Sequence, residues 1–166
     1  MVPWIERPND VANLLNPAFC GLLLRKAVDG YASESKTGLP YPLAFLVLPI
    51  LLHEATRDSL PPRISTVLHA WLQKNPHIRP GFASRVETLL PYTREALIYV
   101  GLRKVLDFSE DHQSIVAGSI KVSTAKIEID LTLEVEDCIK QASFVGRWLA
   151  VSGNTRNIYG FWGIQP

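Results

Sequence analysis

The C-terminal stretch ASFVGRWLAVSGNTRNIYGFWGI, residues 142–164, decides how the rest of the chain must be arranged. Apolar residues recur at helical spacing through its first half, from Phe144 to Val151. Ser152-Gly153 predicts the end of that helix, because glycine adopts the left-handed conformation there at little cost. Either Asn154 or Thr155 is a suitable cap for a second, short helix. Helices joined by so tight a turn cross steeply, so their aromatic faces need a third surface that buries them.

This pair of helices has two competing interpretations. A helix-turn-helix that reads DNA should place several Arg, Lys, Asn or Gln side chains on its second helix. Here the second helix carries Arg156 and Asn157 near its start, and mostly aromatic or aliphatic residues after them. Aromatic residues mark buried or interface surface more often than base contacts. The sequence therefore favours a helical hairpin that packs on the core of the chain or on a partner subunit.

The composition of the whole chain indicates a folded protein without a strong electrostatic field. The 166 residues are 47% hydrophobic, which is enough to bury a core. The formal net charge of +1 excludes global attraction to nucleic acid or to an anionic membrane, though not a local basic patch. The two cysteines, Cys20 and Cys138, lie far apart on apolar stretches, which indicates two buried thiols in a reducing compartment.

Two segments bear on the location of the protein. Residues 1–8 lack the basic and apolar regions of a signal peptide. The apolar run at residues 41–52 is shorter than the ~20 residues of a membrane span, and charged side chains follow it at once. We therefore expect a cytoplasmic protein with no membrane segment.

Prolines and helix caps define the first predicted helices. Asn16 followed by Pro17 predicts a helix start, and that helix should run to about Tyr31. A second helix is expected at residues 43–54, with Pro49 in its interior producing a kink.

Two further helices complete the predicted bundle. The third should cover residues 63–72, whose apolar side chains lie on one face. The fourth should cover residues 82–90, where Pro91 interrupts it. Thr93 is then expected to cap a continuation over residues 94–105.

The chain changes from helical to extended character after this bundle. Residues 105–108 and 114–118 predict a β-hairpin around a charged turn, and residues 123–130 are either a further strand or a linker. A β-hairpin that follows a compact helical bundle is the element order of a winged-helix domain. The predicted fold is mostly α with a small β-hairpin, and winged-helix-like.

We expect a single domain over residues 1–166. Its four consecutive parts are an extended arm (1–10), a helical bundle (11–106), a β-hairpin or wing (107–130) and a C-terminal helical hairpin (131–166). Two prolines within the first eight residues keep the arm from forming a helix.

Motifs that would indicate catalysis or a cofactor are incomplete in this sequence. Lys36-Thr37-Gly38 lacks the glycine-lysine pattern of a phosphate-binding loop, and no Walker motif is present. His53-Glu54 matches half of a zinc-protease motif, but Arg57 stands where the second histidine is needed. No Gly-x-Ser-x-Gly elbow or comparable nucleophile motif occurs either. We expect no enzyme activity, no cofactor and no metal, and interpret the chain as a binding module.

Several charged residues lie inside or beside the apolar helices. Such positions are suited to buried or interfacial ion pairs, in which a planar guanidinium satisfies several acceptors. The residues are Asp10, Arg25, Arg94, Glu95 and Arg147.

Four stretches of the chain resemble the small middle component of bacterial three-component ABC-ATPase systems. They are ANLLNPAFC (12–20); GLPYPL (38–43) with the apolar run that ends at His53; PYTREAL (91–97); and FVGRW (144–148) through Tyr159 to GIQP (163–166). Together these stretches extend over nearly the whole chain.

The resemblance implies a non-enzymatic subunit that works with other proteins. Its partners would be an SMC- or Rad50-like ABC ATPase and a third component, for which a nuclease effector is one candidate. Systems of this kind, including those similar to Lamassu, are associated with defence against phages and plasmids. The subunit would bridge or clamp the ATPase and reach DNA through the complex, and a homodimer is left open. Since the chain has no Walker motif, ATP hydrolysis would belong to the partner.

Our main hypothesis is an accessory subunit, or adaptor, that binds the SMC-like ATPase. We expect binding through the aromatic C-terminal stretch and the helix that follows Asn16. The candidate partner-binding residues are Phe19, Arg94, Arg147, Trp148, Tyr159 and Trp162.

The alternative hypothesis is a winged-helix DNA-binding regulator. It predicts salt-dependent binding through basic side chains. The candidate contacts are Lys104, Lys121, Arg156 and the segment 79–85.

Overall fold

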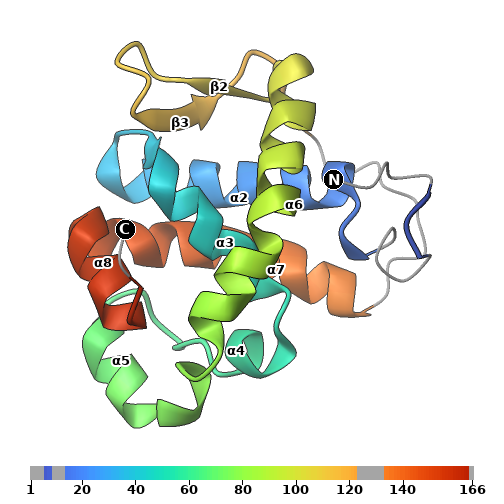
Figure 1. Cartoon of the computed structure of the whole chain (residues 1–166). Coiled ribbons are helices and arrows are strands. Elements are labelled where there is room, and N and C mark those ends of the chain that lie inside the picture. Colours follow the sequence, from blue (N-terminus) through green and yellow to red (C-terminus); the bar gives the residue numbers. More distant parts are fainter. Residues whose placement is uncertain (1–5, 9–13, 123–132, 165–166) are drawn as a thin grey trace.

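Two long helices, α2 (Pro17–Ser35) and α7 (Leu133–Val151), pack against each other at the centre of the fold (Figure 1). The computed structural model describes residues 6–8, 14–122 and 133–164. Glycines bring the two helices close together. A β-carbon on Gly30 would overlap the carbonyl oxygen of Ser143, and one on Gly146 would overlap that of Ala27.

The start of α2 agrees with the sequence. The Asn16 side chain accepts a hydrogen bond of 2.8 Å from the Ala18 N–H, and Pro17 occupies the first helical position. The helix continues to Ser35, beyond the predicted end at Tyr31. It stops at Lys36, which takes a left-handed conformation with a φ of 62°.

The apolar run after α2 forms a short 3-10 helix, η2 (Tyr41–Leu43), and then α3 (Ala44–Leu51). The prediction of one helix over residues 43–54 was wrong at its end. His53 accepts a hydrogen bond from the Thr56 N–H and thereby caps a separate helix, α4 (Glu54–Asp58).

The third predicted helix begins later than expected. Helix α5 (Leu68–Lys74) starts after a turn in which the Thr66 N–H bonds to the carbonyl oxygen of Arg63. A short 3-10 helix, η3 (Pro76–Ile78), then leads towards α6.

Helix α6 (Phe82–Leu102) crosses α2 and also packs on α3. The predicted interruption at Pro91 was wrong, because the helix continues through it. Thr93 does not cap a new helix, since its hydroxyl donates to the Leu89 carbonyl oxygen one turn back. A proline in a helix removes one backbone hydrogen bond. Packing against two neighbouring helices keeps α6 continuous despite this loss.

The predicted hairpin is confirmed as β2 (Leu106–Phe108) and β3 (Ser114–Ala117), which pair antiparallel. A third strand that the sequence did not predict, β1 (Leu39–Pro40), pairs with the other edge of β3 and places Leu39 opposite Ile115. The mostly helical class with a small antiparallel sheet is thus confirmed. The winged-helix likeness and the single-domain assignment stay predictions, and residues 123–130 lie outside the described part.

The C-terminal hairpin packs on the core of its own chain. The Asn154 side chain caps α8 (Thr155–Trp162) by accepting from the Asn157 N–H. On the inner side of the hairpin, the Trp148 indole donates 2.7 Å to the Thr66 carbonyl oxygen, and Trp162 stacks on Phe82 at 3.8 Å between ring centroids. The sequence left open whether this hairpin packs on the core of the chain or on a partner subunit. In the structure it packs on the core.

Both cysteines are buried and unbridged, as predicted. Burial raises the pKa of the Cys20 thiol to about 12 and also raises that of Cys138. None of the described helices combines the length and the apolar character that a membrane span requires.

Candidate partner-binding groove

An apolar groove of about 460 Å³ lies between the C-terminal half of α6 and the small sheet. Figure 1 shows this end of α6 beside β2. We call it the α6–hairpin groove. The residues that define it are Arg94, Ile98 and Leu102 of α6, Phe108 and Ile115 of the hairpin, and Tyr41 of η2.

Local geometry explains why these side chains converge. Residues four apart on a helix share one face, so Arg94, Ile98 and Leu102 form a single row along α6. In the sheet, Phe108 pairs with Ile115, which places both side chains on one face. The Tyr41 ring lies 5.8 Å from that of Phe108, measured between centroids.

The groove exposes large apolar side chains to solvent. Leu102 is 78% exposed, Ile98 63% and Phe108 48%. Single exposed apolar residues are ordinary on a protein surface, whereas several that line one groove are typical of an interaction site. The groove is therefore suited to an apolar partner surface.

Two charged side chains line the groove, Arg94 of α6 and Asp107 of β2. Arg94 is exposed and has no ion pair among residues 6–8, 14–122 and 133–164. Its neighbour Glu95 is already occupied, because both of its carboxylate oxygens accept hydrogen bonds of 2.8 Å from Arg7. The prediction of an ion pair at Glu95 is confirmed, and its partner is Arg7 in the N-terminal arm.

A buried arginine fixes the hairpin side of the groove. Arg25 of α2 donates through Nη1 to the carbonyl oxygens of Val105, at 2.6 Å, and Ile120, at 3.1 Å, which flank the two strands. Its Nε bonds to Asp29, as the sequence predicted for an arginine beside an apolar helix. These hydrogen bonds connect the β2–β3 hairpin to α2 and thereby fix the position of the sheet side of the groove.

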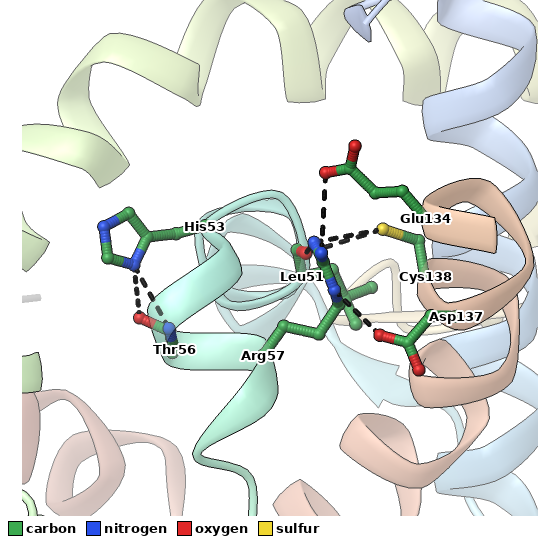
Figure 2. A network of polar contacts seen from close by, with 7 residues as sticks. All are labelled: Leu51, His53, Thr56, Arg57, Glu134, Asp137 and Cys138. Carbon is green, nitrogen blue, oxygen red and sulfur yellow. Dashed lines mark hydrogen bonds and ion pairs between the residues drawn. The ribbon is translucent and has the colours of Figure 1, made fainter. Parts of the chain in front are cut away.

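A second buried arginine, which sequence analysis missed, joins α4 to α7 (Figure 2). Arg57 donates to Asp137 at 2.9 Å, to the Leu51 carbonyl oxygen at 2.8 Å and to Glu134 at 3.4 Å. Its Nη1 also lies 3.4 Å from the Cys138 sulfur. The only sequence signal was the place of Arg57 in the incomplete zinc motif.

The Arg57 network has the chemistry of a structural clamp. Its guanidinium is neutralised by carboxylates of α7, and no group of three or more His, Cys, Asp or Glu within the described residues could hold a metal ion. The network positions the start of α7.

The structure places the predicted partner-binding residues in different environments. Arg94 lines the groove, and Phe19 is half-buried against the core. The Nε of Arg147 is buried without a hydrogen-bond partner among the described residues. The remaining three predicted side chains are buried in the core: Trp148, Tyr159 and Trp162. Little of these three side chains is exposed, and partner binding by them stays a prediction.

The candidate DNA contacts are only partly brought together. The Ile120 N–H donates 2.9 Å to the Lys104 carbonyl oxygen, so exposed Lys104 and Lys121 lie on adjacent segments. Arg156 lies on α8, which Figure 1 shows on the opposite side of α2 from the hairpin. The segment 79–85 begins α6 at the far end from the hairpin. Contact of these residues with DNA also stays a prediction.

Comparison with known families agrees with the resemblance found in the sequence. A family model described as ABC-three component (ABC-3C) system Middle Component 3 matches residues 4–166, a range that includes both sides of the groove. The chain has no match among the curated proteins and none among the solved structures. The likeness to SMC-containing or Lamassu systems goes beyond this description and stays a prediction. With a match over nearly its full length, the chain belongs to the Middle Component 3 family of ABC-three component systems.

Proposed function

We propose that this chain is a non-enzymatic accessory subunit that binds the SMC- or Rad50-like ABC ATPase of its system. Binding takes place through the α6–hairpin groove, and the complex acts in defence against phages and plasmids. The observation that carries this proposal is the set of exposed apolar side chains in the groove, Ile98, Leu102 and Phe108. Membership of a multi-component family supports it, since such a subunit needs a surface for another component.

The energetics of interfaces support a groove of this kind. Binding energy is concentrated in a few apolar or aromatic anchors, often with an arginine, that become fully buried on association. The groove offers both types of residue, and Arg94 adds selectivity for a partner with a complementary acidic group.

Co-expression with the ABC ATPase encoded beside this chain tests the proposal. Size-exclusion chromatography with light scattering should show a shared peak. The variants Ile98→Asp and Phe108→Asp should weaken the complex by at least about tenfold, because each puts a charge into an apolar interface.

The matched control is Val67→Asp, which places the same charge on a side chain that is 64% exposed but lies outside the groove. This variant should bind like the wild type. A complex that tolerates both groove variants, or no complex with the ATPase at all, contradicts the proposal.

The alternative, a DNA-binding regulator, is supported by the adjacency of the Lys104 and Lys121 segments. It predicts that the isolated protein shifts a DNA probe at low salt, and that Lys104→Glu with Lys121→Glu abolishes the shift. DNA binding in the absence of ATPase binding would favour this alternative.

A further inference from the structure

Gly101 lies in the wall of the α6–hairpin groove, close to the end of α6. A β-carbon built on Gly101 meets no atom of the described structure within 4 Å. Three other helical glycines are required by packing: Gly21 against Val100, Gly30 against Ser143 and Gly146 against Ala27. Gly160 of α8 is open in the same way as Gly101, but it lies outside the groove. Packing among the described residues therefore does not explain the glycine at position 101.

Backbone conformation does not explain it either. Glycine is common just after a helix because it adopts positive φ values without strain. The described glycines with positive φ are Gly81, Gly153 and Gly163, whereas the left-handed residue after α6 is Lys104, with a φ of 56°. Glycine inside a helix lowers its stability relative to alanine. Gly101 thus weakens the free protein, with no compensating contact in the described part of the chain.

The missing side chain leaves the backbone of α6 open within an apolar surface. Gly101 belongs to the same face as Arg94 and Ile98, at a spacing of three or four residues between neighbours. The distance between two packed helices depends on the side chains at their contact, and glycine permits the closest approach. This face of α6 is shaped to receive another helix.

The sheet side of the groove is less suited to receive an extended strand. The free edge of β2 directs the Phe108 N–H outward, and that group already donates 2.9 Å to the Asp107 side chain. A strand that paired with this edge would have to break that bond. A helix lying along the groove needs no backbone hydrogen bond from β2.

The charge of the groove specifies one more property of the occupant. Arg94 has no ion pair within the described residues, and Glu95 is held by Arg7. The Asp107 carboxylate also lines the groove, but it accepts from the Phe108 N–H and forms no ion pair with Arg94 among the described residues. A carboxylate on the incoming helix would supply an ion-pair partner for Arg94.

We infer that the α6–hairpin groove binds an amphipathic α-helix of the ABC ATPase, which crosses α6 at Gly101. Apolar side chains of that helix pack on Ile98, Leu102 and Phe108, and an Asp or Glu of the same helix pairs with Arg94. This inference rests on the proposed function and adds the secondary structure and the chemistry of the partner segment.

Gly101→Ala tests the inference, because its two effects have opposite directions. In the free protein it should raise the Tm by about 2 °C, since alanine favours the helix. In the complex the added methyl group should keep the partner helix from its close approach. Titration calorimetry with the purified ATPase should show an affinity at least about tenfold weaker.

Gly160→Ala is the matched control. Gly160 lies in α8, and a β-carbon there also meets nothing within 4 Å. This variant should raise the Tm by a similar amount and leave the affinity unchanged. Arg94→Glu should weaken binding, and the loss should grow as the salt concentration falls, because repulsion is then less screened.

The outcomes separate this inference from the proposed function. If Gly101→Ala binds as tightly as the wild type while Ile98→Asp does not bind, the groove has another kind of occupant and the inference is overturned alone. If neither variant changes ATPase binding, both are overturned. If the variants change only a monomer–dimer equilibrium, the occupant is a second copy of this chain and both are again overturned. A Gly101→Ala protein that melts below the wild type assigns Gly101 a structural role and also overturns the inference.

Discussion

Gly146 of α7 lies directly against the main-chain carbonyl of Ala27 in α2, with no room between them for a β-carbon. A reciprocal contact brings Gly30 of α2 to the carbonyl of Ser143. The central helices thus touch through their backbones at two places. Since interiors are close-packed and adapt poorly to added volume, this contact fixes how α2 and α7 lie against each other.

Gly146→Ala should therefore destabilise the protein by about 3 kcal/mol, because the new methyl group has to push the helices apart. Urea unfolding followed by circular dichroism measures the change. Gly160→Ala, at an open position of α8, serves as the control and should not lower stability. An unchanged midpoint for Gly146→Ala would contradict the backbone contact between α2 and α7.

Arg57→Ala should cost about 3 kcal/mol, because it removes the buried cation that joins α4 to the carboxylates of α7. Arg57→Lys should recover only part of this loss, since an ammonium cannot reproduce the planar fork of hydrogen bonds. Asp137→Ala should cost less, about 1 kcal/mol, because the Asp137 side chain is 40% exposed. Equal losses for Arg57→Ala and Asp137→Ala would contradict a contribution from the other three partners of Arg57, which are Glu134, Cys138 and the Leu51 carbonyl.

Stability should fall as the pH drops below the ordinary pKa of histidine, owing to His53. Burial, helped by the charge of Arg85, lowers the pKa of His53 in the folded protein. The unfolded chain then binds the proton more readily, so the contribution of His53 is complete above about pH 6.5. It is lost as the pH falls through the folded pKa, when protonated Nδ1 no longer accepts from Thr56.

Thermal melts from about pH 7.5 to about pH 5 check this expectation, with His53→Asn as the comparison. Asparagine is a good N-cap that does not titrate in this range, so the variant should lose the part of the pH dependence that His53 causes. Identical pH profiles for the two proteins would refute the role of His53.

Neither cysteine should react with a thiol reagent in the native protein. Burial raises the pKa of Cys20 to about 12 and raises that of Cys138, so the reactive thiolate is scarce as well as inaccessible. Both should react rapidly in denaturant. Fast labelling of Cys138 alone under native conditions would indicate that the Arg57 network opens frequently.

Elements whose formation depends on neighbouring residues could be predicted from the sequence. The cap at Asn16, the start of α8 and the β2–β3 hairpin follow from residue types at adjacent positions, and the structure confirms them. Of the two candidate caps of α8, Asn154 and Thr155, Asn154 is the one used. The prediction failed at Pro91, because tertiary packing of α6 outweighs the local cost of a proline. It also missed β1, since two residues carry no periodic pattern and gain their strand character only by pairing with β3.

In the candidate site, too, features set by local sequence were predicted and features set by tertiary packing were not. Arg94 was identified from its charged character beside an apolar helix, and it lines the groove. The groove itself was not predicted, because its walls are distant in sequence and are joined by β1–β3 pairing and by Arg25. The aromatic residues Trp148 and Trp162, which were candidates for partner binding, fill the core, and partner binding by them stays a prediction. Amino-acid type indicates that a side chain is buried, but not by which surface.

The pairing of Leu39 with Ile115 also has a consequence for the order of folding. The segment between Leu39 and Ile115 contains α3 to α6. Closing so long a loop costs conformational entropy, so we expect the pair to form only after those helices have assembled. We expect pulse-labelled hydrogen exchange to show protection in α2 and α6 before the β1–β3 pair. Tyr41, which follows β1, takes its place in the groove at that late step. A partner that recognises the groove would thereby select chains that have finished folding, and newly made, incomplete subunits would stay out of the assembly.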